Sequence, residues 1–309
     1  MFATAKAWVG TRAMADPATS AFPDPGRAGG ESISLESVSL RVEAPEGTTE
    51  ILRDASLRVG AGELVCLLGP SGSGKTTILN LVAGLAKPTS GLVLEGDAPV
   101  SGPGPDRAVV FQDAALFPWL TLRANVEFPL KLQRLDRDAR AARSEELLRM
   151  VHLWRFCDRY PHQLSGGMRQ RGAMARALAT DPAVLLMDEP FAALDSQTRE
   201  ILQGEVERIW SATHKTIIFV THNVREAVRL ADRVVLMGTR PGRILHEEII
   251  DLPRPRAAND PRVASLANGI GRRIASEVEK VAREEADDAW TGPGGRGTGD
   301  PRRHLGGGI

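Results

Sequence analysis

The stretch Gly69-Pro70-Ser71-Gly72-Ser73-Gly74-Lys75-Thr76-Thr77 directly follows the apolar run 64–68 and precedes residues with helical spacing. It matches the phosphate-binding pattern G-x-x-x-x-G-K-[ST] in the strand-to-helix setting that gives the pattern its meaning. Its glycines let backbone N–H groups curl around a phosphate chain, and the helix N-terminus adds the positive end of its dipole. We therefore expect these nine residues to bind the phosphates of a nucleoside triphosphate.

Two side chains of this phosphate loop have separate expected tasks. Lys75 would reach the β- and γ-phosphates, and the hydroxyl of Thr76 would ligate Mg²⁺. A glycine-rich turn without a ligand is the alternative, but the chain has only six lysines in 309 residues, which argues against a chance match. The loop by itself does not separate a kinase, a GTPase and a transport ATPase.

The composition narrows the class of protein. The chain has 39 Lys and Arg against 39 Asp and Glu, so its net charge is zero and it lacks the basic excess of a dedicated nucleic-acid binder. Its apolar runs fall well short of the ~20 residues that span a bilayer. The two cysteines, Cys66 and Cys157, form no paired motif, which argues against a disulfide framework or a cysteine metal site.

Beyond the loop, short apolar runs alternate with longer stretches of helical spacing, which predicts an α/β domain with a mostly parallel central sheet. The expected strands are 64–68, 108–111, 183–187, 217–220 and 234–237. The expected helices are 75–86, 137–152, 167–179, 196–211 and 223–231. Residues 113–178 read as mostly helical, which suggests a subdomain inserted into the sheet.

Two carboxylates, Asp188 and Glu189, end the apolar strand at 183–187. In α/β sheets, ligands bind beyond the C-terminal ends of the strands. Asp188 is therefore expected to hold Mg²⁺, and Glu189 to polarise a water molecule for attack on the γ-phosphate. A solvated acidic turn is the alternative, and the phosphate loop in the same chain disfavours it.

A further segment, Leu164-Ser165-Gly166-Gly167-Met168-Arg169-Gln170-Arg171, precedes this acidic strand. Together with the phosphate loop, the acidic strand end, Gln112, Ala193-Leu194-Asp195 and Thr221-His222, it resembles the ATP-binding subunits of ABC transporters. All six elements occur in the family order, and the resemblance covers roughly residues 33–250.

The resemblance implies a P-loop NTPase ABC cassette with a RecA-like parallel-sheet core, an antiparallel β subdomain and an inserted helical subdomain. The implied domain spans 31–251, with its helical insert at about 113–178. We expect a disordered leader over 1–30, a C-terminal helical extension over 252–289 and a disordered tail over 290–309. Six residues define one apolar face of the extension: Val263, Leu266, Ile270, Ile274, Val278 and Val281.

The family roles carry over to matching positions. Glu189, His222 and Gln112 would be the catalytic residues, with His222 holding the γ-phosphate and Gln112 sensing Mg²⁺ and the attacking water. Gln112 would thus join Thr76 and Asp188 around the metal. Structural alternatives stay open: a strand-end amide for Gln112 and a structural imidazole for His222.

The remaining family roles concern a second subunit. Ser165, Gly166 and Gly167 begin a helix whose N-terminus can hold phosphate. The resemblance implies that they contact the ATP bound to the opposite subunit. Asp195 would contact the facing phosphate loop, and an N-cap of the following helix is a compatible alternative.

Residues 102–112, 116–121 and 251–256 resemble the nitrate/sulfonate/taurine importers within this family. In that resemblance, Phe117-Pro118-Trp119-Leu120 lies in the region that meets the membrane subunit, with core packing as an equal alternative. One departure is Val42, which stands where the family places an aromatic residue that stacks on adenine.

We therefore predict an ATP-hydrolysing subunit that energises an importer for a small anion or organosulfur solute through ATP-driven dimer closure. The implied cofactors are ATP and Mg²⁺. The implied partners are a second copy, integral membrane permease subunits and, indirectly, an extracytoplasmic solute-binding protein, with no nucleic acid. This places the chain peripherally on the cytoplasmic face of the cell membrane. The alternative is a soluble ABC ATPase acting on nucleic acid or ribosomes.

Overall fold

The computed structural model describes residues 29–44, 47–192, 194–257 and 259–290. Nearly all of the predicted leader and tail lies outside these ranges. Within them, no helix combines the length and the apolar character that crossing a membrane requires.

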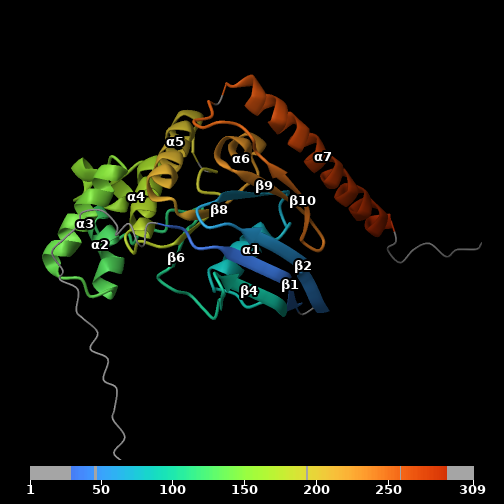
Figure 1. Cartoon of the computed structure of the whole chain (residues 1–309), viewed down its shortest axis with the longest axis horizontal. Helices are drawn as coiled ribbons and strands as arrows, with labels where there is room; N and C mark the ends of the chain where they lie inside the picture. Colours follow the sequence, from blue (N-terminus) through green and yellow to red (C-terminus); the bar gives the residue numbers. More distant parts are fainter. Residues whose placement is uncertain (1–28, 45–46, 193, 258, 291–309) are drawn as a thin grey trace, which may run out of the picture.

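The centre of the molecule is a six-stranded sheet in the order β10-β9-β3-β8-β7-β6 (Figure 1). Five strands run parallel: β3 (Leu64–Leu68), β6 (Arg107–Val110), β7 (Val184–Asp188), β8 (Thr216–Thr221) and β9 (Arg233–Gly238). They confirm the five expected strands within two residues. Strands covered on both faces carry continuous apolar runs in their interiors, which explains why they stand out in the sequence.

The edge strand β10 (Arg243–Ile249) runs antiparallel to β9 and was not predicted. Its residues are exposed or half-buried and include His246, Glu247 and Glu248. A strand with this composition carries no continuous apolar run, so only its pairing partner identifies it.

A second, antiparallel sheet has the order β2-β1-β4-β5. Its strands are β1 (Ile33–Ala44), β2 (Gly47–Val59), β4 (Ser90–Glu95) and β5 (Ala98–Pro99). Helix α1 (Lys75–Val82) lies between the two sheets, where Ile78, Leu79 and Val82 join one apolar core with both. This confirms the expected combination of a parallel core and an antiparallel sheet.

Helix α1 ends at Val82, four residues before the predicted end at 86. Gly84 has a φ of +73°, and a Cβ there would lie 2.2 Å from the carbonyl of Gly102. The helix stops because the chain turns at this glycine and packs tightly on its neighbour.

Between β6 and β7 the chain is mainly helical. It forms α2 (Leu122–Leu132), α3 (Arg137–Met150), two 3₁₀ turns (Trp154–Phe156 and Pro161–Gln163) and α4 (Gly166–Leu178). Polar side chains start each α-helix: Thr121, Asp136 and Ser165 accept hydrogen bonds from first-turn N–H groups. The buried Asn125 side chain bonds the backbone of Phe117, Leu120 and Thr121, which fixes the loop before α2.

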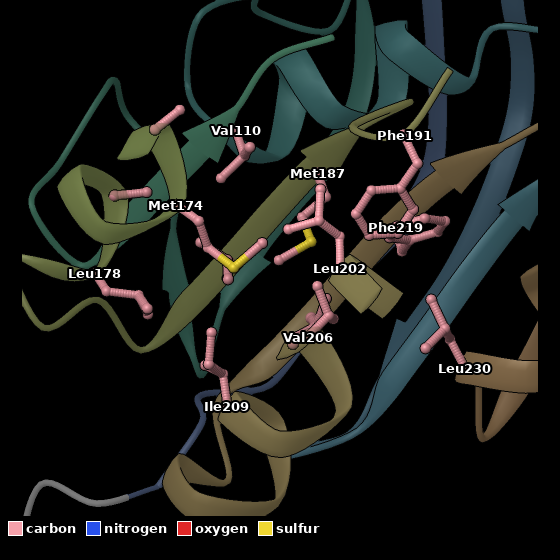
Figure 2. Close-up of a cluster of buried hydrophobic side chains, with 14 of the residues drawn as sticks. Val110, Met174, Leu178, Met187, Phe191, Leu202, Val206, Ile209, Phe219 and Leu230 are labelled. Carbon is pink, nitrogen blue, oxygen red and sulfur yellow. The ribbon is translucent and has the colours of Figure 1, made fainter. Parts of the chain in front are cut away.

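Helices α4, α5 (Ser196–Thr213) and α6 (Val224–Leu230) cover the other face of the parallel sheet. Figure 2 shows the core they form, with side chains from α4 and α5 packed on those of the strands. The labelled members are Val110, Met174, Leu178, Met187, Phe191, Leu202, Val206, Ile209, Phe219 and Leu230.

The last helix, α7 (Pro261–Trp290), packs beside α6 through Val263, Ala267 and Ile270 (Figure 1). Leu266 and Ile274 of the predicted apolar face are partly buried on the same core, whereas the side chains of Val278 and Val281 lie outside the described part.

A link without helix precedes α7. There the buried Arg256 guanidinium donates to the carbonyls of Val228, Ile250 and Leu252, and thereby closes the C-terminal end of α6. Arg254 pairs with Asp232 at 2.7 Å and lies over the ring of Trp210. These contacts fix the link to α5 and to the end of α6 before α7 begins.

The junction of the two sheets yields a pH-dependent prediction. Glu95 at the end of β4 pairs with Arg107 at the start of β6, yet burial and the neighbouring Asp106 carboxyl raise the pKa of Glu95 to about 7. A folded pKa above the unfolded value of 4.5 stabilises the fold at low pH, and this stabilisation is lost as pH rises through 7. The Tm advantage of Glu95→Gln over the wild type should therefore grow between pH 6 and 8, by roughly 2–4 °C.

Thermal unfolding monitored by circular dichroism measures this difference. Glu36→Gln, an exposed carboxylate on the neighbouring strand β1, is the matched control and should follow the wild type. A Glu95→Gln curve parallel to the wild type across this range would contradict the assignment.

Candidate functional site

Three loops singled out in the sequence follow neighbouring strands. β3 pairs in parallel with β8, and β8 pairs in parallel with β7. The loops that follow these strands, which begin at residues 69, 189 and 222, therefore emerge at the same edge of the sheet.

The phosphate loop is held around the ammonium group of Lys75. Its Nζ donates to the carbonyl oxygens of Gly69 at 2.9 Å and Pro70 at 2.8 Å, and to the Ser73 hydroxyl at 3.3 Å. Burial lowers the pKa of Lys75, and the nearby carboxylates of Asp188 and Glu189 oppose this effect. The ammonium group of Lys75 thus has three oxygen acceptors from the loop itself. Phosphate oxygens of a bound nucleotide can take the place of these acceptors.

Two glycines of the loop adopt backbone angles that other residues avoid, with φ of +79° at Gly72 and +82° at Gly74. Close packing restricts a third, because a Cβ on Gly69 would lie 2.5 Å from the carbonyl oxygen of Met237. All nine predicted loop residues thus form one turn and the first residues of α1, with Ser71, Gly72 and Thr76 exposed.

The Thr76 hydroxyl donates to Asp188 Oδ1 at 3.2 Å, which joins the start of α1 to the end of β7. Burial raises the pKa of Asp188, and the hydrogen bond from Thr76 partly offsets this. A hydroxyl and a carboxylate at this distance are the hard oxygen donors that Mg²⁺ prefers, so the residues present fit this ion.

Glu189 lies directly beside His222. The His222 Nδ1 and Glu189 Oε2 atoms are 3.1 Å apart. Glu189 has a φ of +42°, an uncommon value for a residue with a side chain, and its N–H donates to the carbonyl of Val220 at 3.0 Å. This backbone conformation turns the carboxylate away from the strand and toward the imidazole.

A buried hydrogen-bond network, which the sequence did not predict, lies next to the Glu189–His222 pair. Glu226 accepts hydrogen bonds from the Thr221 hydroxyl at 2.6 Å and from Gln203 Nε2 at 3.1 Å. Arg199 Nε lies 3.6 Å from the same carboxylate. The network therefore connects α5 to the residue that precedes His222.

A signal for Glu226 was present in the sequence. Asn223 caps α6, and Glu226 stands three residues later, which is the spacing of a capping box. In the structure the carboxylate bonds to Thr221 instead, so the spacing predicted the helix start but not this contact.

The segment Ser165-Gly166-Gly167 and Asp195 form a second group, at the N-termini of α4 and α5. Ser165 Oγ accepts from the N–H of Met168, and Asp195 accepts from both the N–H and the hydroxyl of Thr198. The two helix starts touch, since a Cβ on Gly167 would lie 2.3 Å from the Thr198 methyl carbon.

Ser165, Gly166 and Asp195 are exposed, and among the described residues none of them bonds to the phosphate loop of its own chain. The structure thus brings Lys75, Thr76, Asp188, Glu189 and His222 together and leaves the second group apart. Its exposed helix starts are free to meet another molecule.

Two further predicted residues are exposed at the edges of the site. Gln112 follows β6, one strand beyond β7, and within the described part its side-chain amide makes no hydrogen bond. Val42 is 46% exposed on β1 and pairs with Thr49 of β2. Ile51 follows Thr49 by two residues on β2, and its carbonyl lies near Gly74 of the phosphate loop. Val42 is therefore on the part of β1 that pairs next to this loop.

Known ATP-binding proteins of ABC transporters are similar to this chain in sequence. The family described as ABC transporter matches residues 52–192. An uncharacterized ABC transporter ATP-binding protein from Methanocaldococcus jannaschii is 49% identical over 224 residues, covering 72% of this chain and 84% of that protein. A taurine import ATP-binding protein from Burkholderia pseudomallei is 44% identical over 257 residues, covering 81% of this chain and 99% of that protein.

Among solved structures, a dimeric ATP-binding cassette in a post-hydrolysis state bound to ADP and Pi superposes with a TM-score of 0.65. It is 34% identical, and the match covers 72% of this chain and all of that cassette.

The buried network predicts the effect of changing Glu226. In Glu226→Gln, an amide N–H₂ group replaces one of the carboxylate oxygens that accept from Thr221 and Gln203. One of these buried donors then lacks an acceptor, so we expect the free energy of unfolding to fall by about 1–3 kcal/mol. Urea unfolding measures it. The control Glu200→Gln changes an exposed carboxylate on α5 and should cost less than about 0.5 kcal/mol. Equal stability of the two variants would contradict the role of Glu226.

Proposed function

Because this chain belongs to the ABC transporter family of ATP-binding proteins, we propose that it energises an importer for a small anion or organosulfur solute. The chain is an ATPase that binds ATP. We propose, beyond this, the importer, its solute, the second copy and the role of each residue.

The observation that carries the proposal is the division of the site into two groups within one chain. Lys75, Asp188, Glu189 and His222 lie together at one edge of the sheet, whereas the exposed Ser165 and its glycines begin α4 outside this group. A second copy would supply its 165–167 segment to this nucleotide, and would receive the same in return. The dimeric state of the ADP-bound cassette supports this arrangement.

The proposed chemistry follows from the geometry of the first group. The phosphate loop binds the triphosphate through backbone N–H groups and Lys75. Thr76 and Asp188 would hold Mg²⁺, and Gln112 of the neighbouring loop would join them; when bound, this ion would offset negative charge on the phosphates. Glu189 accepts a proton from the water that attacks the γ-phosphate, and the bond from the γ-phosphorus to the bridging oxygen breaks, so that ADP leaves. His222 orients the water and contacts the γ-phosphate. Asp195 contacts the phosphate loop of the second copy.

A contact with a membrane permease has its own support. Trp119 is 71% exposed, and its ring lies 5.5 Å from that of Phe117, which in turn lies 4.8 Å from that of Phe128. Leu116, three residues before Trp119, is buried in the helical subdomain. Within residues 116–120, Leu116 therefore packs in the core, whereas Trp119 belongs to an exposed aromatic group that suits an interface. ATP-driven closure of the dimer would move this group, and with it the permease.

The solute class rests on the relatives. The match to two taurine import ATP-binding proteins extends over 99% of their length and 81% of this chain. This supports an organosulfur or similar small anion, carried with the help of an extracytoplasmic solute-binding protein. The chain would then work peripherally at the cytoplasmic face of the membrane.

Substitution of Glu189 tests the mechanism. Glu189→Gln keeps the size of the side chain and removes its basicity, so ATP turnover should fall about 10²-fold or more while ATP binding persists. Phosphate release and fluorescent-nucleotide binding measure the two effects, with Glu200→Gln as the control. Undiminished hydrolysis in Glu189→Gln would contradict the proposed general base.

Substitution of Trp119 tests the permease contact. We expect Trp119→Ser to reduce recruitment to membranes that contain co-expressed permease subunits, with an unchanged Tm because the side chain is exposed. Leu132→Ser, also 71% exposed on the helical subdomain but outside the aromatic group, is the control. Recruitment that is equal in both variants would exclude Trp119 from the interface.

A further inference from the structure

A cleft lies between the loop that carries His222 and helix α7. We call it the α6–α7 cleft, and the following residues line it: His222, Asn223, Val224, Arg225, Ala267, Asn268, Gly271, Arg272 and Ala275. Four of them belong to the cassette and five to α7, so the cleft exists only because the extension packs on the cassette.

The charged lining of the cleft is entirely basic. Arg225 and Arg272 are exposed, and in the described part of the chain no hydrogen bond or ion pair engages either guanidinium group. None of the described residues that line the cleft carries a carboxylate. His222, Asn223 and Asn268 add polar groups that can donate hydrogen bonds.

Neighbouring arginines on α7 behave differently. Arg273 pairs with Glu248 at 2.7 Å, and Arg262 pairs with Asp260 at 2.7 Å. Arg272 thus differs from these two arginines of its own helix, which each have a carboxylate partner. Two unpaired guanidinium groups at one cleft create a local positive potential that favours an anion.

The cleft is open to solvent, and small residues line its α7 side. These are Ala267, Gly271 and Ala275, and a Cβ added to Gly271 would meet nothing within 4 Å. A glycine inside a helix costs about 0.5–1 kcal/mol relative to alanine. At Gly271 no backbone contact requires that cost, and its effect is to leave room beside Arg272.

We propose that the α6–α7 cleft binds a small tetrahedral oxyanion, a phosphate, sulfate or sulfonate group, between Arg225 and Arg272. The planar guanidinium group presents paired N–H donors that match such oxygens and binds them more strongly than neutral donors do. This site is separate from the phosphate loop. Because His222 and Asn223 line the cleft, an anion there contacts the same loop that serves ATP hydrolysis.

Direct binding to the full-length chain tests the proposal. The phosphate loop also attracts oxyanions, so titrations use the Lys75→Ala background, at constant ionic strength because exposed charges are screened by salt. Three probes are titrated by isothermal calorimetry: inorganic phosphate, inorganic sulfate and taurine. We expect one site per chain. Binding of the inorganic ions without taurine would assign it to free inorganic anions, and binding of all three would assign it to the shared oxyanion group.

Matched variants decide whether the cleft is the site. Arg272→Gln should weaken binding at least about tenfold, whereas Arg273→Gln, one residue further along the same helix, should change it less than twofold. Gly271→Leu fills the cleft and replaces a helical glycine, so binding should be lost while the Tm stays equal or rises.

Three results would overturn the proposal. One is the absence of binding by all three probes, and another is equal weakening by Arg272→Gln and Arg273→Gln. The third is a loss of self-association in Arg272→Gln, measured by analytical ultracentrifugation, without any oxyanion binding. In that case the cleft would receive acidic side chains of a second copy.

Discussion

The parallel pairing of three buried strands is the constraint on which the site depends. β3 pairs with β8 and β8 with β7, residue by residue and in one direction. Because these strands are buried on both faces, a shift in register would displace apolar side chains from two cores at once. The loops that follow the strands are therefore held at fixed positions, and the hydrogen bond between Thr76 and Asp188 joins residues 112 positions apart.

The sequence predicted best what local patterns specify. Five continuous apolar runs gave the parallel strands, and the phosphate loop gave the start of α1. The predicted end of α1 was wrong by four residues, because the chain turns at Gly84, where a side chain would also clash with Gly102. β10 was missed because an edge strand with charged residues lacks the apolar signal of the central strands.

The same distinction applies to the site. Residues at strand ends, such as Asp188, Glu189 and His222, follow from the rule that parallel strands end at one edge. Glu226 does not follow from it, because its role depends on which way its side chain turns from α6. The contact between Gly167 and Thr198 likewise joins two helix starts that no sequence pattern relates. The geometry leaves the functional roles of Ser165, Asp195 and Gln112 as predictions, since each faces outward.

Arg256 limits how far the chain can be truncated from its C-terminal side. Its buried guanidinium satisfies carbonyl groups at the end of α6 and in the link that follows β10. A chain that ends near residue 250 would leave the carbonyl groups of Val228 and Ala231 without this donor. The extension is thus an integral part of the folding unit, and a minimal version of the protein has to retain at least the link through Arg256.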